Sequence, residues 1–151
     1  DSSNVIVFMG YGQLEDKIKQ HSMDHANIFF QEAVSPDKLL DYTSSADFGI
    51  ATIQNTCLSY YYCLPNKIFE YIMANLPVIV SDLPEMRRII EVDQVGIIAK
   101  ENNVERLKEA IKEAKGLDNT TFLKNITKVQ EIYNWDNQEK ILLSVYKNLE
   151  E

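Results

Sequence analysis

The chain has 151 residues, of which 45% are hydrophobic and 25% are charged, and its formal net charge is −8. This length fits one domain that can bury about 70% of the surface of its unfolded chain, and the composition is typical of a soluble globular protein. The acidic balance argues against nonspecific binding to nucleic acid or to an anionic membrane surface.

No apolar run approaches the ~20 residues that a membrane span needs, and the opening, DSSNVIVFMGYG, lacks the basic region and cleavage site of a signal peptide. The chain opens almost directly on a predicted strand, so we expect a fragment that begins near a domain boundary.

Cys57 and Cys63 are too few and wrongly spaced for a zinc site or a C-x-x-C motif. They predict free thiols in a reducing compartment, and hence a cytoplasmic location. His21 and His25 can share a helix face, but two ligands do not make a metal site.

The hydrophobic pattern predicts strands that alternate with helices. The first strand is a continuous apolar run, which predicts burial on both faces. In chain order the pattern predicts strand 5–9, helix 14–21, strand 27–30, helix 36–42, strand 46–53, loop 54–64, helix 66–75, strand 77–80, helix 84–90, strand 95–99 and helices 103–115, 120–133 and 136–149.

Several helix ends carry recognisable signals. Ser35 and Pro36 predict an N-cap followed by proline at the first helical position. Gly116 suits the position just after a helix, and Asp136 with Glu139 has the spacing of a capping box. Strands alternating with helices imply parallel pairing with right-handed crossovers. We therefore expect an α/β fold: an open, doubly wound, Rossmann-like parallel sheet in three α/β/α layers, with a helical C-terminal tail.

Ligands bind such sheets beyond the carboxyl ends of the strands. The segments that reach this edge are residues 10–12, residues 31–34 and the loop that leads into the helix starting at Asn66. Gly10 and Gly12 leave room for a ligand beside the backbone, although a tight strand exit with positive φ explains them equally well.

The helix that begins at Asn66 is the stronger candidate. Asn66, Lys67 and Glu70 fall on the side opposite its apolar stripe, and Pro65 fits the first turn because its missing N–H costs nothing there. The free N–H groups of that turn can hold a pyrophosphate, and Glu70 can accept hydrogen bonds from two vicinal ribose hydroxyls. An exposed Lys67–Glu70 ion pair is the competing interpretation, and helix physics does not choose between them. The apolar stripe, predicted to be core, is Ile68, Phe69, Ile72, Met73 and Leu76.

The segment LPNKIFEYIMANLPVIVSDLPEMRRII...VGII resembles the C-terminal domain of GT-B-fold glycosyltransferases of the group 1 family, with their P-x-K-x-x-E-Y-x-x-x-x-x-P-V pattern. Further segments resemble that domain in the same order: VIVFMGYG, NIFFQEAVSPDKLLDYTSSADFGIA and YNWDNQEKILLSVYKNL. The residues that match the pattern are Pro65, Lys67, Glu70, Tyr71, Pro77, Val78 and Gly96.

The resemblance implies that residues 1–151 form a domain that binds a nucleotide-diphosphate-sugar donor. It puts Glu70 at the ribose, and the backbone of residues 31–34, Val34 included, around the base. Tyr62 stands where many members have a second glutamate. The family's N-terminal acceptor domain, and a strand and helix with a diphosphate-clamping Arg and Lys, are absent, so we expect that this chain alone does not transfer sugar.

For the whole protein the resemblance implies a transferase of the hexosyltransferase type, in surface polysaccharide biosynthesis. The chain has no D-x-D motif, so neither a metal nor another cofactor is expected. Two alternatives stay open: a nucleotide-sugar epimerase of the same fold, and a non-catalytic binding or scaffold module that has lost the donor site. A receiver-type signalling domain would need acidic residues after the first strand, and none follow Met9 directly.

Overall fold

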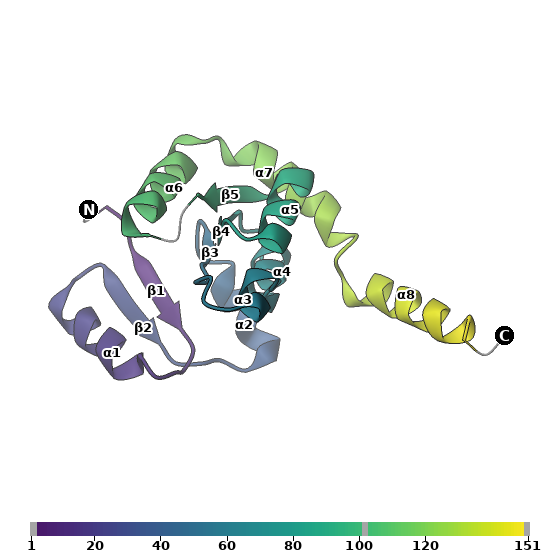
Figure 1. Ribbon diagram of the computed structural model, residues 1–151. Coiled ribbons are helices and arrows are strands. Elements are labelled where there is room, and N and C mark those ends of the chain that lie inside the picture. Colours follow the sequence, from purple (N-terminus) through teal and green to yellow (C-terminus); the bar gives the residue numbers. More distant parts are fainter. Residues whose placement is uncertain (1–2, 101–102, 150–151) are drawn as a thin grey trace. The chain divides into compact units, whose positions relative to one another are not determined.

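The computed structural model describes residues 3–100 and 103–149 (Figure 1). The chain divides into two compact units, Asp1–Leu39 and Leu40–Glu151. Both are built from parallel strands joined by helices, as predicted, and the second carries the helical C-terminal tail. The α/β class with open parallel sheets is therefore confirmed.

The first unit contains β1 (Ile6–Met9), α1 (Glu15–Asp24) and β2 (Ile28–Gln31). The strands pair in parallel, from Ile6 opposite Ile28 to Met9 opposite Gln31. The predicted burial of the first strand on both faces is wrong: the paired residues Val7 and Phe29 are 58% and 49% exposed. Residues 3–39 supply this sheet with a single crossover helix, and one helix covers only one face.

The second unit contains β3 (Gly49–Ala51), β4 (Val78–Ser81) and β5 (Gly96–Ala99), in the sheet order β3-β4-β5 with every pair parallel. The crossovers are α4 (Asn66–Met73) and α5 (Pro84–Asp93). The central strand β4 is buried along its whole length, which agrees with its apolar run Val78, Ile79 and Val80.

The core lies on both faces of this three-stranded sheet. Val78 and Val80 of β4 point into one apolar cluster and Ile79 into the other, as the alternation of a strand requires. The first cluster is completed by α4, α5 and α7 (Asn119–Gln130), and the second by α6 (Val104–Gly116). Figure 1 shows α6 on one side of these strands and α4 and α5 on the other, so this unit has the predicted three layers.

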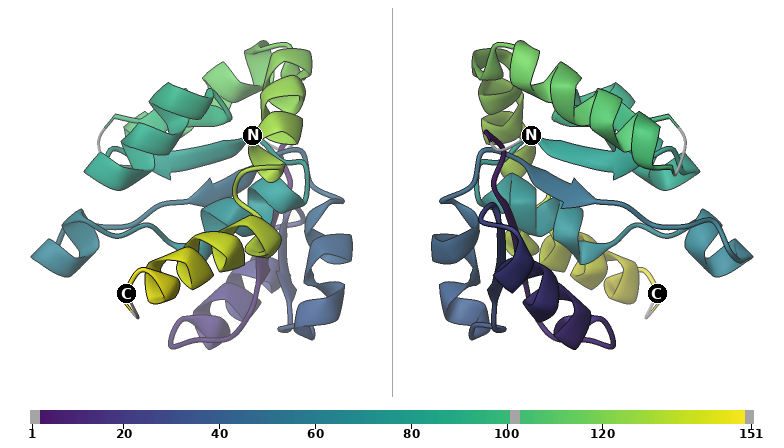
Figure 2. Two further views of the ribbon diagram at one scale, coloured as in Figure 1. Left: turned by 90° about the vertical axis from the view of Figure 1, so that its right-hand side faces the viewer. Right: turned by 90° about the vertical axis from the view of Figure 1, so that its left-hand side faces the viewer.

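The remaining helices are α2 (Pro36–Thr43), α3 (Leu58–Tyr61) and α8 (Trp135–Lys147). Helix α2 begins at Pro36 as predicted, and the carbonyl of Ser35 accepts a hydrogen bond from the Lys38 N–H at 2.9 Å. The short helix α3 lies in a segment predicted to be loop, and Figure 2 shows it at the tip of the connection from β3 to α4. Tyrosine-rich sequence has only moderate helix propensity, which explains why its pattern did not reveal this single turn.

Two predicted helix ends are corrected. The side chain of Asn134 accepts from the Asn137 N–H at 2.9 Å and caps α8, so the predicted box of Asp136 and Glu139 is wrong. Gly116 is the last residue of α6, and Leu117 is the C-cap, so the predicted position of Gly116 after the helix is also wrong. Within the described ranges, no helix is long and apolar enough to cross a bilayer.

Candidate functional site

Helix α4 begins where the sequence places a proline. Pro65 is the N-cap in an extended conformation, with φ −75° and ψ 144°, and its carbonyl accepts from the Ile68 N–H at 3.2 Å. Proline at this position fixes φ and has no N–H to leave unpaired. The first N–H groups of a helix have no partner inside it, so this turn presents donors to whatever lies in front of it.

The far end of α4 is held by a left-handed residue and by α7. Asn75 has φ 62°, the Leu76 N–H donates to the Tyr71 carbonyl at 2.9 Å, and the Asn75 N–H donates to the Ile72 carbonyl at 3.0 Å. This is a Schellman motif with asparagine in place of glycine. The amide of Gln130 in α7 donates to the same Ile72 carbonyl at 2.7 Å. The helix that carries the candidate site is thus fixed at its C-terminus.

A close contact sets α4 against β3. A Cβ atom on Gly49 would lie 2.1 Å from Cγ of Tyr71, so only glycine admits the tyrosine ring here. The Tyr71 hydroxyl donates to the Ile50 carbonyl at 3.4 Å. Burial, together with the negative charge of Glu70, raises the pKa of the Tyr71 phenol. The ring therefore stays neutral at physiological pH and acts as a spacer between helix and strand.

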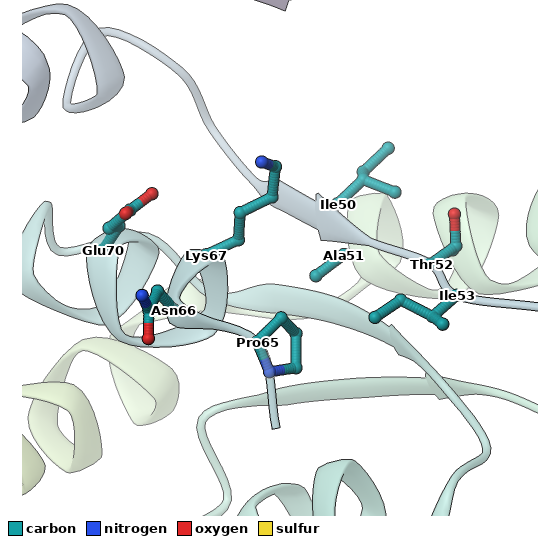
Figure 3. A pocket seen from close by; sticks show the side chains of 8 residues that line it. All are labelled: Ile50, Ala51, Thr52, Ile53, Pro65, Asn66, Lys67 and Glu70. Carbon is teal, nitrogen blue, oxygen red and sulfur yellow. The ribbon is translucent and has the colours of Figure 1, made fainter. Parts of the chain in front are cut away.

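A pocket of about 550 Å³ lies at the carboxyl end of β3 (Figure 3). Its size is within the range of small-molecule sites. One wall is the strand and its exit, and the other is the start of α4. The lining residues are Ile50, Ala51, Thr52 and Ile53 on the first wall, and Pro65, Asn66, Lys67 and Glu70 on the second.

The two charged side chains of the pocket, Lys67 and Glu70, do not form an ion pair with each other. Figure 3 shows the Lys67 side chain extended toward Ile50 and away from Glu70. Among the ion pairs of the described residues, none joins Lys67 to Glu70, so the competing interpretation as a helix-surface ion pair is wrong for this structure. The apolar stripe of the helix packs into the core on its other side, with Ile68 and Ile72 fully buried, as predicted.

The structure therefore brings Pro65, Asn66, Lys67 and Glu70 together around one cavity. Residues 50–53 of the strand wall did not figure among the predicted site residues. The predicted strand ran to Ile53, whereas β3 ends at Ala51. A strand exit at the ligand-binding edge of a parallel sheet is the signal that could have identified them.

The remaining predicted site residues belong to the first unit. Gly10 has φ 137° and follows β1, and its N–H donates to the Gln31 carbonyl at 3.1 Å, so a strand exit with positive φ accounts for this glycine. The Gly12 carbonyl accepts from the Glu15 N–H at 3.1 Å at the start of α1. Val34 is half-buried and follows β2. A role for these residues in ligand binding stays a prediction.

No group of three or more His, Cys, Asp or Glu side chains in the described part of the chain is placed to hold a metal ion. The rings of His21 and His25 stack with centroids 5.9 Å apart. Cys57 and Cys63 are free thiols, as predicted.

Residues 2–116 match the family described as glycosyl transferases group 1. This range is most of the chain. The chain belongs to the group 1 glycosyltransferases. The resemblance inferred from the sequence is therefore confirmed, and the general activity of the family is glycosyl transfer. A comparison with curated proteins finds no match.

The match to the group 1 glycosyltransferases ends at the last residue of α6 and includes β1 to β5 and the pocket. The tyrosine that departs from the family pattern lies outside the lining: Tyr62 is the C-cap of α3, is 61% exposed, and contacts the Tyr61 ring edge-on at 4.8 Å between centroids.

Proposed function

We propose that the pocket between β3 and α4 binds the nucleotide-diphosphate part of a sugar donor. The observation that carries the proposal is the joint position of Glu70, Lys67 and the start of α4 around one cavity of about 550 Å³. In this arrangement Glu70 accepts hydrogen bonds from the two ribose hydroxyls, because the two oxygens of a carboxylate accept side by side.

The pyrophosphate is held by the opening N–H groups of α4 and by Lys67. Both supply positive electrostatic potential where the donor carries negative charge. The same groups stabilise the nucleoside diphosphate as it leaves, when its charge grows during glycosyl transfer. This chemistry needs no metal ion, so we expect donor binding to survive chelation with EDTA.

The wider assignment extends the family's general activity. We propose transfer of a hexose in surface polysaccharide assembly, in the cytoplasm, with the acceptor and the catalytic base supplied by a further, N-terminal domain. Residues 1–151 alone are then expected to bind donor without transferring sugar. Sugar transfer by the isolated chain would contradict this division of labour.

A thermal-shift panel tests the pocket. Wild-type chain is heated with UDP, GDP, ADP and TDP and their sugars, and one base is expected to stabilise it, by about 2.7 kcal/mol at 100 times the Kd. Glu70→Ala and Lys67→Met are each expected to reduce the shift. Glu91→Ala in α5 and Lys112→Met in α6 are the matched controls, because both residues are exposed and lie outside the pocket lining.

Three results would contradict parts of the proposal. A shift that survives Glu70→Ala unchanged would remove the ribose assignment. A longer chain with both domains that binds none of the diphosphates would favour a scaffold module. Turnover of a nucleotide sugar to its epimer without any acceptor would favour an epimerase.

A further inference from the structure

We propose that Ser81 is a positioning residue for the donor, because its hydroxyl holds the strand wall of the pocket in place. The residue does not line the pocket. It acts through the backbone of Ile53, whose N–H donates to Ser81 Oγ at 2.8 Å. This inference rests on the proposed binding of a nucleoside diphosphate.

This hydrogen bond links the chain to β4 beyond the last paired residue of β3. Strand β3 pairs with β4 only as far as Ala51 opposite Val80. Thr52 and Ile53 follow outside the ladder and form the outer part of the strand wall. The Ser81 side chain reaches past the end of the ladder and fastens this exit to the last residue of β4.

Ser81 is itself rigidly held, so it can serve as an anchor. It is 3% exposed and pairs with Ala99 of β5 on its other side. Its carbonyl accepts from the Leu83 N–H at 2.9 Å, and the next residue, Asp82, forms an ion pair with Arg87 of α5. Because this strand end is buried and paired, the Ser81 side chain loses little conformational entropy when the hydrogen bond forms. Its oxygen, which is the acceptor, therefore stays in one place.

The Ile53–Ser81 bond and the packing of the Ile53 side chain against the first apolar cluster together hold the strand wall. The helix wall is fixed by the Gly49–Tyr71 contact and by the two ends of α4, whereas the strand wall beyond Ala51 has left the ladder. A site gains affinity when its walls are held in the bound geometry before the ligand arrives. Ser81 therefore contributes to donor binding without touching the donor.

The experiment compares Ser81→Ala with Ser144→Ala in α8. Both remove one serine hydroxyl, but Ser144 bonds the Ile141 carbonyl within its own helix. The readouts are the amide exchange rate of Ile53 by NMR and the Kd for UDP, GDP, ADP and TDP by calorimetry. In Ser81→Ala the exchange rate is expected to rise by about tenfold and the Kd of the preferred diphosphate by about threefold to tenfold. Ser144→Ala should change neither.

The outcomes separate this inference from the proposed function. If the wild-type chain binds none of the diphosphates, the proposed function fails and takes this inference with it. If the wild type binds but Ser81→Ala has the same Kd, or the same Ile53 exchange rate, only the positioning role is overturned. Ser81→Thr keeps the hydroxyl and is expected to restore both values. A Ser81→Thr variant with the wild-type Tm and the weak affinity of Ser81→Ala would overturn the proposal as well.

Discussion

The two sheets of this chain are built from the same strand-helix-strand unit but differ in how they are covered. The central strand β4 of the three-stranded sheet is buried at every position, whereas the residues of β1 in the two-stranded sheet are exposed or half-buried. The exposed strand is the more apolar of the two, with the sequence IVFM against VIVS. An apolar run thus identifies a strand, while the helices and neighbouring strands around it decide how much of it is buried.

The difference has a structural origin within each unit. The three-stranded sheet receives helices on both faces, so Val78 and Val80 on one side and Ile79 on the other all meet packed side chains. The two-stranded sheet has α1 as its crossover helix and leaves Val7 and Phe29 open. The candidate pocket lies on the well-covered sheet, where a rigid support can hold it.

The largest expected difference in stability is between two isoleucine substitutions, one in each sheet. Ile79→Ala, at a side chain 1% exposed, is expected to lower the free energy of unfolding by about 2–5 kcal/mol because it leaves a cavity in a packed core. Ile6→Ala, at a side chain 36% exposed, is expected to cost about 1 kcal/mol or less. Urea denaturation followed by circular dichroism measures both. Equal costs would show that β1 is as well covered as β4.

A smaller difference in stability is expected between two glycine substitutions, one in each unit. Gly49→Ala puts a Cβ atom into the Tyr71 ring and is expected to cost about 1–3 kcal/mol. Gly12→Ala meets no atom within 4 Å and is expected to change stability by less than about 0.5 kcal/mol. The cost of Gly49→Ala should fall in a Tyr71→Ala background, since the two residues share the contact. An unchanged cost there would mean that the clash is not with this ring.

The sequence was a good guide to features that depend on local pattern. The strands, the order of the helices and the start of α4 at Asn66 follow from periodicity and from proline at a helix start, and the structure has them. The apolar stripe of α4 follows from helical spacing, so the opposite positions of Lys67 and Ile68 could be predicted.

The features that the sequence did not reveal depend on tertiary contacts. The strand wall of the pocket is bonded to β4 through Ile53 and Ser81, which are 28 residues apart in sequence. The need for glycine at position 49 becomes visible only once Tyr71 lies over it. The exposure of β1 depends on which elements pack around it, and no pattern within four residues carries that information.

The C-terminal helices also differ in burial, and the smallest effect on global stability is expected there. In α7, Ile126 is fully buried. Helix α8 lies wholly within the described residues, and none of its residues is buried. Asn134→Ala removes the N-cap of α8 and is expected to cost that helix about 1 kcal/mol, seen as a loss of helical circular dichroism. Since α8 contributes nothing to the core, the urea midpoint should stay nearly constant.

Asp136→Ala is the matched control, because Asp136 lies in the first turn and is not the cap. A larger loss of helix in Asp136→Ala than in Asn134→Ala would restore the capping box that the sequence spacing predicts.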